Sequence, residues 1–435
     1  MKTVTVAIVG FGTVGSGVAR ILLESGETVA ARAGVRLKLK YVCDTELARD
    51  RGVKVPAELL TNDLDRVLAD PEVTVVCELV GGTTTAYDVV ERCLRAGKDV
   101  VTANKALLAE RGEPLVKLAR ELGKAICFEA AVAGGLPLIL AVRDGLVANR
   151  ITGLTGILNG TSNYILTSMT KQGTSYKKAL AEAQAKGYAE ADPTLDVSGG
   201  DSAHKLTVLA RLAFDVPARF EDVHCEGIQK IEAADVRYAA ELNYTIKLLA
   251  IGRRGADGGV SLRVHPAFVP RSNPLAHVDG PFNAVMVRGD ETGDTLYYGA
   301  GAGQRPTASA VVADLVDVAL GRAEITFAAR DIFSIAGKGT VQSIDDVPSR
   351  YYLRFDVVDQ PGVLSRITGV LGAHHISIAS VLQHEPVEAT SVPLMIMTHL
   401  AVERDMRVAL KEFAGLDVVH NRPVCIRVLD EERSR

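Results

Sequence analysis

The stretch TVTVAIVGFGTVG, residues 3–15, decides the fold of the N-terminal part of the chain. Residues 3–9 are rich in β-branched side chains and predict a short buried strand. Gly10, Gly12 and Gly15 follow with G-x-G-x-x-G spacing, directly before a helical pattern, which favours a phosphate-binding turn over a purely structural one. The predicted dinucleotide-binding residues are Gly10, Phe11, Gly12, Thr13, Val14 and Gly15.

The next strand, residues 37–44 (LKLKYVCD), ends at Asp44, where a carboxylate is expected to bind a ribose hydroxyl of the dinucleotide. Asp44 lies further from the glycines than the ~20 residues usual for this motif. Lys40, Arg49 and Arg51 lie nearby in the sequence and could hold a 2′-phosphate instead. The sequence therefore leaves NAD or NADP open, with NADP slightly favoured.

Strands and helices continue to alternate up to about residue 133, which predicts a parallel sheet with ligands at the carboxyl ends of its strands. The strands are expected at 74–82, 98–106 and 125–132, and the helices at 85–97 and 107–123. Asn104 and Lys105 lie at one of these strand ends. From position alone, a ligand-binding lysine and an ordinary surface lysine at the start of a helix are equally good interpretations of Lys105.

Residues 187–214, GYAEADPTLDVSGGDSAHKLTVLARLAF, gather carboxylates around one lysine, Lys205. The second half has a helical pattern that is apolar on several sides, so the helix is expected to be buried. Asp201 lies four residues before Lys205 and shares its face of the helix. Such pairs are usually exposed ion pairs, but a lysine in a buried helix is costly unless paired and can then donate a proton. The stretch is therefore a predicted active site, with further carboxylates at Glu182, Glu190, Asp192 and Asp196.

From residue 134 the pattern changes to an α+β arrangement. A helix is expected at 134–146, and residues 151–166 combine a strand with a turn, Asn159-Gly160-Thr161-Ser162, whose donors suit a carboxylate or simply cap a helix. Alternating segments then predict an antiparallel sheet, with strands at 227–231, 245–254, 259–269, 283–289 and 294–303. A glycine-to-helix run after these strands is expected to pack back on the first domain.

Residues 333–350 are polar and irregular, and predict a linker. Residues 351–435 then alternate as βαββαβ, the order of a ferredoxin-like module. The turn at 359–362, Asp-Gln-Pro-Gly, offers backbone amides that could hold a small ligand; a structural or dimerising module is the alternative. The predicted domains are 1–133 for the dinucleotide, 134–332 for the substrate and dimerisation, and 351–435 for regulation.

The composition excludes several classes of protein. A chain of 435 residues with 47% hydrophobic and 23% charged residues is typical of a soluble enzyme. The formal charge of -4 and the lack of a basic face argue against a nucleic-acid partner, and no apolar run is long enough to span a membrane. Six cysteines without paired spacing indicate reduced thiols in the cytoplasm, with neither a zinc site nor disulfides.

Several motifs together resemble the monofunctional homoserine dehydrogenases with a C-terminal ACT domain, over nearly the whole chain. These are GFGTVG, VVTANKALLA, FEAAVAGGLP, GILNGTSNYI, GYAEADPTLDVSGGDSAHK and DQPGVLSRITGVL. The resemblance implies an α/β protein with a Rossmann-type domain, an α+β substrate and dimerisation domain, and an ACT domain. It implies NAD(P)H-dependent reduction of L-aspartate 4-semialdehyde to L-homoserine on the route to threonine, methionine and isoleucine. A threonine effector at the ACT domain and a homodimer or homotetramer are also implied.

The resemblance also assigns roles to individual residues. Lys205 corresponds to the proton donor and Lys105 to a lysine that contacts cofactor and substrate, although either could deliver the proton. Glu190 corresponds to a ligand of the substrate's amino group. The remaining implied positions are Asp196 and Asp201, which assist Glu190; Thr161 at the substrate; Gly303 at the nicotinamide; and Glu129, Val132, Gly134 and Leu136, which hold a monovalent cation, usually sodium.

The residues are less consistent with two other functions. An aspartate-semialdehyde dehydrogenase needs a nucleophilic cysteine beside a base, and none of the six cysteines lies in such a sequence context. A non-catalytic sensor of dinucleotide and amino acid would have no need of a charged lysine in a buried helix. Glu190, Asp201 and Lys205 therefore favour an enzyme.

Overall fold

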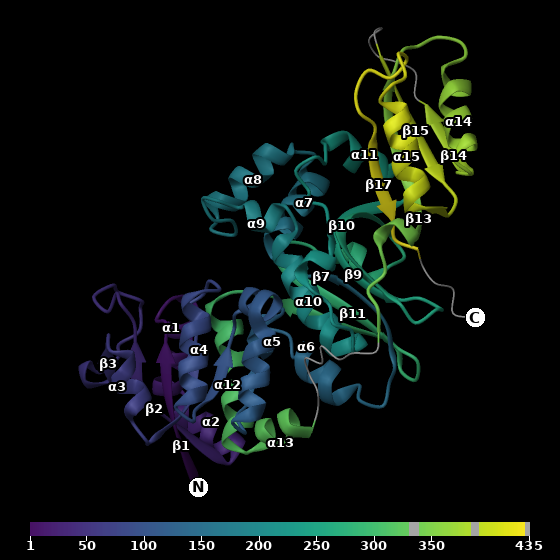
Figure 1. The fold of residues 1–435 in the computed structure, drawn as a ribbon. Coiled ribbons are helices and arrows are strands. Elements are labelled where there is room, and N and C mark those ends of the chain that lie inside the picture. The colour runs from purple at the N-terminus through teal and green to yellow at the C-terminus, as the bar shows by residue number, and fades with distance from the viewer. Residues whose placement is uncertain (330–338, 384–390, 431–435) are drawn as a thin grey trace.

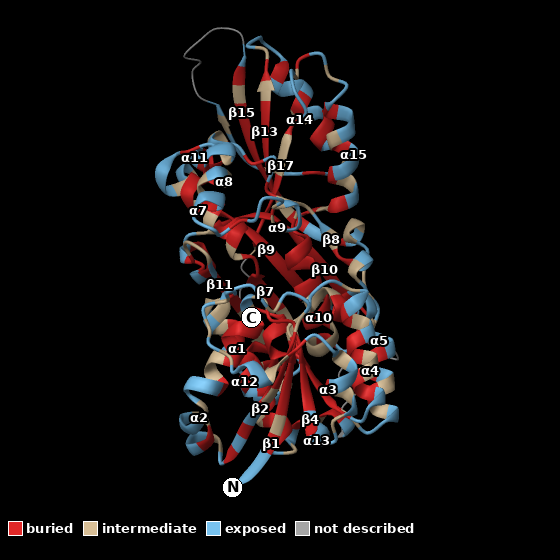
Figure 2. Ribbon diagram, turned by 90° about the vertical axis from the view of Figure 1, so that its left-hand side faces the viewer, coloured by how far each residue is buried: buried red, intermediate tan, exposed pale blue. Residues whose placement is uncertain are grey.

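The computed structural model describes residues 1–329, 339–383 and 391–430. Figure 1 shows three regions in a row: the N-terminal domain at one end, a central region built on a mixed sheet, and the C-terminal module at the other end. The core strands of the first two regions are almost entirely buried (Figure 2). None of the helices among these residues is long and apolar enough to cross a membrane.

The N-terminal domain is a parallel sheet with the strand order β3-β2-β1-β4-β5-β6, which confirms the predicted Rossmann-type fold. Buried β-branched residues fill the central strands, as expected for a parallel sheet covered on both faces. Its strands are β1 (Lys2–Val9), β2 (Val35–Cys43), β3 (Leu60–Thr61), β4 (Val73–Glu78), β5 (Asp99–Thr102) and β6 (Ile126–Cys127). Its helices are α1 (Thr13–Glu24), α2 (Gly26–Ala33), α3 (Leu64–Ala69), α4 (Thr85–Arg95) and α5 (Lys105–Glu121).

The central region packs helices against a sheet that starts with the order β12-β11-β7-β9-β10. Its strands are β7 (Ile151–Ile157), β8 (His224–Cys225), β9 (Tyr244–Arg254), β10 (Val260–Pro270), β11 (Phe282–Gly289) and β12 (Gly293–Ala300). Its helices are α6 (Leu138–Leu140), α7 (Gly160–Gln172), α8 (Tyr176–Ala185), α9 (Thr194–Val197), α10 (Gly200–Phe214) and α11 (Ala233–Glu241). The strand predicted at 227–231 is wrong, because these residues form a turn.

Two helices return from the central region to the first domain. They are α12 (Gln304–Ala319) and α13 (Arg322–Ala329), and Figure 1 shows α12 among the helices of the N-terminal domain. The side chain of Gln304 donates to the Ser16 hydroxyl of α1 at 2.9 Å. At the other end of α12, Lys2 Nζ donates to the Ala319 carbonyl at 2.9 Å. The two regions are therefore joined by packing as well as by the chain.

The C-terminal module has the predicted βαββαβ order, with one additional two-residue strand. Its elements are β13 (Pro348–Val357), α14 (Val363–Ala373), β14 (Ile378–Gln383), β15 (Val392–Thr398), β16 (Ala401–Val402), α15 (Glu403–Phe413) and β17 (Val424–Val428). Successive side chains of β13 point to opposite faces of the sheet. Phe355 packs edge-on against Phe413 of α15, whereas Tyr352 stacks on Phe268 of β10, with ring centroids 4.4 Å apart.

The module is not a separate body, because its sheet continues the central sheet. β17 pairs in parallel with β10 through Ala267↔Arg427 and Phe268↔Val428. One sheet of eleven strands thus runs from β12 through β10, β17 and β13 to β14. The predicted linker at 333–350 lies partly outside the described residues; of the remainder, Val341 forms a bridge to Val260 at the start of β10.

Candidate functional site

The glycine loop lies at the carboxyl end of β1, between β1 and α1. A Cβ atom at Gly10 would lie 2.5 Å from the Leu79 carbonyl, and one at Gly15 would lie 2.0 Å from the Gly10 carbonyl oxygen. A Cβ atom at Gly12 would meet nothing within 4 Å, so this position faces open space at the start of α1. No side chain caps α1, which leaves its first amides available to an anion. The residues therefore fit a pyrophosphate.

Asp44, predicted to bind the ribose, lies directly at this loop. Its carboxylate accepts the backbone N–H of Phe11 at 2.5 Å and that of Glu46 at 2.8 Å. The three basic residues proposed as alternatives for a 2′-phosphate, Lys40, Arg49 and Arg51, each lie near a carboxylate. Lys40 forms ion pairs with Asp70 and Glu72, and Arg51 lies 3.8 Å from Glu46.

Lys105, Asp201 and Lys205 form one constellation, as the sequence predicted for the last two. Lys205 Nζ donates to Asp201 Oδ2 at 2.7 Å and to the Leu158 carbonyl at 2.7 Å. Lys105 Nζ, from the first residue of α5, lies 3.2 Å from Asp201 Oδ1. Burial alone would raise the pKa of the Asp201 carboxyl, but the two lysine charges outweigh it and hold that pKa well below its usual range. Asp201 therefore stays charged and lies between the two ammonium groups, closer to that of Lys205.

Asn159 joins a second carboxylate to this constellation. Its side-chain amide donates to Asp196 at 2.7 Å and to Asp201 at 2.8 Å, while its Oδ1 caps α7 by accepting the Ser162 N–H. Burial, together with the nearby charge of Asp201, raises the pKa of the Asp196 carboxyl above its usual value. The sequence indicated the turn at Asn159 as a set of donors for a carboxylate or as a helix cap, but it did not predict the contacts of Asn159 and the Leu158 carbonyl with α10, which lies about 40 residues later in the chain.

Three of the predicted carboxylates are not brought to Lys205. Glu182 accepts from Tyr164 at 2.7 Å and pairs with Lys186. Asp192 accepts the Thr194 N–H ahead of α9. The Glu190 side chain is exposed and forms no ion pair within the described residues, so it remains free to bind a ligand.

The segment predicted to bind a cation, residues 129–136, is hydrogen-bonded to the loop before α12. Gly134 and Gly135 donate their N–H groups to the carbonyls of Gly301 and Ala300, each at 3.0 Å. Gly303 is the residue before α12. Its neighbour Gln304 donates to the Ser16 hydroxyl near the start of α1, so Gly303 lies close to that end of α1. The loop predicted for the nicotinamide end therefore lies beside the glycine loop.

Glu129 is buried at the start of the same segment. Its two carboxylate oxygens accept the N–H groups of Ile139 and Leu140 at 2.9 and 2.8 Å. Burial raises the pKa of this carboxyl to about 7. Each oxygen keeps a second lone pair, so the carboxylate has acceptor capacity left for a cation. Val132, Gly134 and Leu136, whose carbonyls are predicted to share that cation, follow in the same segment. Thr161, the remaining predicted residue, donates its hydroxyl to the Tyr188 carbonyl at 2.6 Å.

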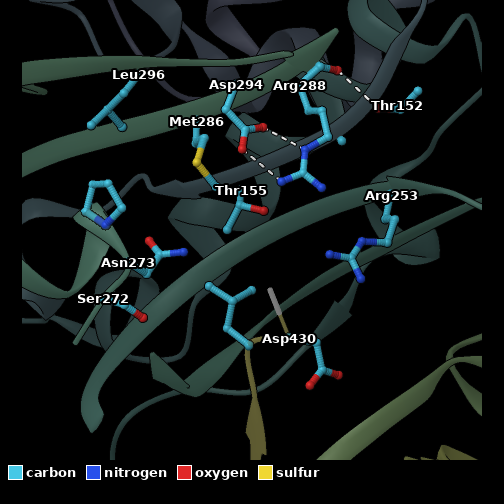
Figure 3. Close-up of a pocket in the computed structure, with 13 residues that line it drawn as sticks. Thr152, Thr155, Arg253, Ser272, Asn273, Met286, Arg288, Asp294, Leu296 and Asp430 are labelled. Carbon is cyan, nitrogen blue, oxygen red and sulfur yellow. Dashed lines mark hydrogen bonds and ion pairs between the residues drawn. The ribbon is translucent and has the colours of Figure 1, made fainter. Parts of the chain in front are cut away.

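Two pockets lie away from this constellation. One lies on the mixed sheet, where Arg288 of β11 forms an ion pair with Asp294, and Arg253 and Asp430 also line the pocket (Figure 3). It contains none of the predicted site residues. The other is in the C-terminal module and is formed by the predicted turn 359–362 together with Leu364, Gln383 and Leu394.

A Rossmann-type domain joined to a second domain with a buried lysine–aspartate pair defines the class of dinucleotide-dependent enzymes. Comparison with known families makes this more specific. Residues 10–129 match the NAD-binding domain of homoserine dehydrogenase, residues 137–316 match homoserine dehydrogenase, and residues 351–417 match the ACT domain.

Known relatives agree over the whole length. A homoserine dehydrogenase from Pseudomonas aeruginosa is 45% identical over 443 residues, covering 98% of this chain and 99% of the relative. The crystal structure of a homoserine dehydrogenase from Thiobacillus denitrificans is 42% identical, with a TM-score of 0.93 and 99% of each chain covered. A hyperthermophilic archaeal homoserine dehydrogenase in complex with NADPH is 26% identical, with a TM-score of 0.62, and covers 74% of this chain and 98% of its own. The chain belongs to the homoserine dehydrogenase family, a family of oxidoreductases, and carries an ACT domain.

Proposed function

We propose that the protein catalyses the NAD(P)H-dependent reduction of L-aspartate 4-semialdehyde to L-homoserine. The observation that carries this proposal is the Lys105–Asp201–Lys205 constellation, which combines two cations and a buried carboxylate beside a dinucleotide-binding domain. The pathway would be the biosynthesis of threonine, methionine and isoleucine, in the cytoplasm. The names of the relatives support the substrate.

The chain's own residues suit a carbonyl reduction. When bound, the nicotinamide supplies the hydride that reaches the carbonyl carbon. An ammonium group near the carbonyl oxygen stabilises the charge that develops there, and donates the proton that completes the hydroxyl. Lys205 suits this step because Asp201 and the Leu158 carbonyl fix its Nζ; water reprotonates it after each turnover. Lys105, with 34% of its side chain exposed, suits a contact with cofactor and substrate.

Acidic side chains would bind the substrate's ammonium group. Glu190 is exposed and forms no ion pair with any residue that the structure describes. Asp196 and Asp201 both accept hydrogen bonds from the Asn159 amide. Thr161 would lie at the edge of the same site. Opposite charges close to the ammonium group would orient the amino acid with its aldehyde towards the lysines.

The nucleotide would lie along the glycine loop, with Asp44 at the ribose and Gly303 at the nicotinamide. The solved NADPH complex of the archaeal relative supports a pyridine nucleotide, and NADP or NAD both fit the loop. A monovalent cation, proposed as sodium, would be held by Glu129 and the carbonyls of Val132, Gly134 and Leu136. A cation there would offset the burial of a carboxylate and brace the loop that contains Gly301.

Regulation is proposed for the C-terminal module. Its pocket at residues 359–362 would take threonine, the amino-acid effector that the resemblance implies, in a homodimer or homotetramer. The pocket offers the amides of a turn that ends at Gly362, whose φ of 93° lies in the left-handed region that favours glycine.

The proposed reaction is tested by the loss of nucleotide absorbance. Purified protein is mixed with L-aspartate 4-semialdehyde and either NADPH or NADH, with and without sodium, potassium and L-threonine. We expect turnover with at least one nucleotide, a rate that rises with the cation, and inhibition by threonine. Folded protein that binds a nucleotide but reduces no semialdehyde would contradict the proposed function.

A further inference from the structure

Helices α5 and α10 pack against each other at the boundary between the nucleotide domain and the central region (Figure 2). Each helix carries one lysine of the constellation. Lys105 is the first residue of α5, and Lys205 lies in the second turn of α10. The spacing of these two helices therefore sets the distance between the two ammonium groups.

A further link between the two helices is a hydrogen bond between two other side chains. His204, next to Lys205 on α10, has its Nε2 atom 2.8 Å from Glu110 Oε1 of α5. The His204 side chain is only 6% exposed, and its ring stacks on Phe220 with centroids 4.3 Å apart. Its Nδ1 atom is buried without a hydrogen-bond partner among the described residues. Glu110 is thus the partner that justifies a polar ring at this buried position.

A second link lies two turns further along α10. Arg211 follows His204 by seven residues and therefore shares its face of the helix. Its guanidinium donates to the carbonyls of Leu108 and Ala109 of α5, both at 2.8 Å, and to the Ala218 carbonyl at 2.7 Å. A planar guanidinium that donates to several fixed oxygens allows little sliding between the helices.

Two pairs of residues on α10 therefore have different tasks. Asp201 and Lys205 form the constellation with Lys105, while His204 and Arg211 contact α5 further along its length. We propose that Glu110, His204 and Arg211, here called the α5–α10 clamp, are positioning residues that hold Lys105 at its distance from Asp201 and Lys205. The clamp acts through Lys105 and touches neither substrate nor cofactor. This inference deepens the proposed function and rests on it.

The clamp is needed because the direct contact is weak. The Lys105–Asp201 pair spans 3.2 Å and involves a lysine that is one-third exposed, and partly exposed pairs contribute little to structure. Without the clamp, α5 can move relative to α10 while both helices remain folded. Misplacing a reacting group by about 1 Å can cost roughly a hundredfold in rate.

The test uses the full-length protein and four variants. His204→Leu and Glu110→Ala remove the hydrogen bond between α10 and α5, and His204→Gln keeps a donor near the position of Nε2. Glu121→Ala is the matched control, since Glu121 is an exposed glutamate at the other end of α5. We measure kcat, the dissociation constant of NADPH from its fluorescence, and hydrogen–deuterium exchange of the amides in residues 105–110.

Loss of the His204–Glu110 hydrogen bond should lower kcat roughly tenfold or more in His204→Leu and Glu110→Ala. NADPH affinity should change less than about threefold, because the clamp does not contact the glycine loop. Exchange in residues 105–110 should become faster in both variants. His204→Gln should keep most of the wild-type kcat, and Glu121→Ala should behave as wild type.

The inference is overturned if His204→Leu and Glu110→Ala both keep kcat within twofold and leave the exchange unchanged. If His204→Leu does not fold, Glu110→Ala decides, because it removes only a partly exposed carboxylate. A wild-type protein that binds NADPH but reduces no semialdehyde would contradict the proposed function alone. The exchange of residues 105–110 would then still decide on the clamp.

Discussion

At the residue scale, the site separates what spacing can predict from what it cannot. The Asp201–Lys205 pair was predicted because four residues on a helix always share a face. The contacts to Asn159 and to the Leu158 carbonyl were not, because they join α10 to a distant turn by tertiary packing. The same limit explains Glu182, which is close to Lys205 in sequence but faces Tyr164 in the fold.

Replacing Lys205 by methionine tests its role as proton donor. Methionine keeps much of the side-chain length but cannot donate a proton, so kcat should fall by roughly 10²–10⁴-fold. Affinity for NADPH should be nearly unchanged, because Lys205 does not contact the glycine loop. Turnover is measured by absorbance and folding by circular dichroism. Near-normal turnover would transfer the proton-donor role to Lys105, which Lys105→Met would then test.

At the scale of single elements, most helices and strands followed from local patterns. The segment 227–231 failed for a physical reason. A Cβ atom at Gly227 would lie 2.2 Å from the Val197 carbonyl oxygen, which instead accepts the N–H of Ile228 at 2.9 Å. The backbone of residues 227–228 therefore bonds to the segment before α10 instead of to a neighbouring strand. An alternating sequence pattern does not show which partner a backbone group has.

Two glycines of one loop should respond differently to the same substitution. Gly15→Ala places a Cβ atom 2.0 Å from the Gly10 carbonyl oxygen and should lower the free energy of unfolding by roughly 1–3 kcal/mol. Gly12→Ala meets no protein atom within 4 Å, so stability should be kept while nucleotide affinity falls at least about tenfold, since the methyl group occupies the path of the pyrophosphate. Thermal melts and NADPH titrations separate the two effects. Equal affinity for NADPH in Gly12→Ala and wild type would place the nucleotide elsewhere.

At the scale of the whole molecule, the sequence predicted three units and the return of a helix, α12, to the first of them, but not how the third unit joins the second. The pairing of β17 with β10 links residues that are far apart in the chain, and local patterns carry no information about such partners. Charged side chains reinforce this junction. Arg427 of β17 pairs with Glu226 of the central region at 3.0 Å and with Glu403 of α15. Arg354 of β13 pairs with Asp235 of α11 at 2.7 Å.

The Glu226–Arg427 pair should make stability depend on pH. Burial alone would raise the pKa of Glu226, but the hydrogen bond with His224 and the charge of Arg427 outweigh it and lower that pKa. The pair therefore stabilises the fold above the unfolded-state pKa of about 4.3, and this contribution is lost as the pH falls through the lower folded-state value.

Replacing Glu226 by glutamine measures this contribution. At neutral pH the variant should lose about 1 kcal/mol, less than a fully buried pair, because 41% of the Glu226 side chain is exposed. The difference from wild type should shrink as the pH falls below about 4. Chemical unfolding between pH 7 and pH 3 provides the measurement, with Glu121→Gln as control. A difference that stays constant across this range would contradict a role for the charge.

The continuous sheet has a consequence for the nascent chain. β10 is translated long before β17, and at 5–20 residues per second the delay is roughly ten to thirty seconds. During this time the Ala267–Phe268 edge of β10 has no β17 beside it, and unpaired strand edges recruit other chains. The ribosome-bound protein is therefore aggregation-prone until β17 has been made. Its yield in cells should depend on translation speed and on chaperones that cover strand edges.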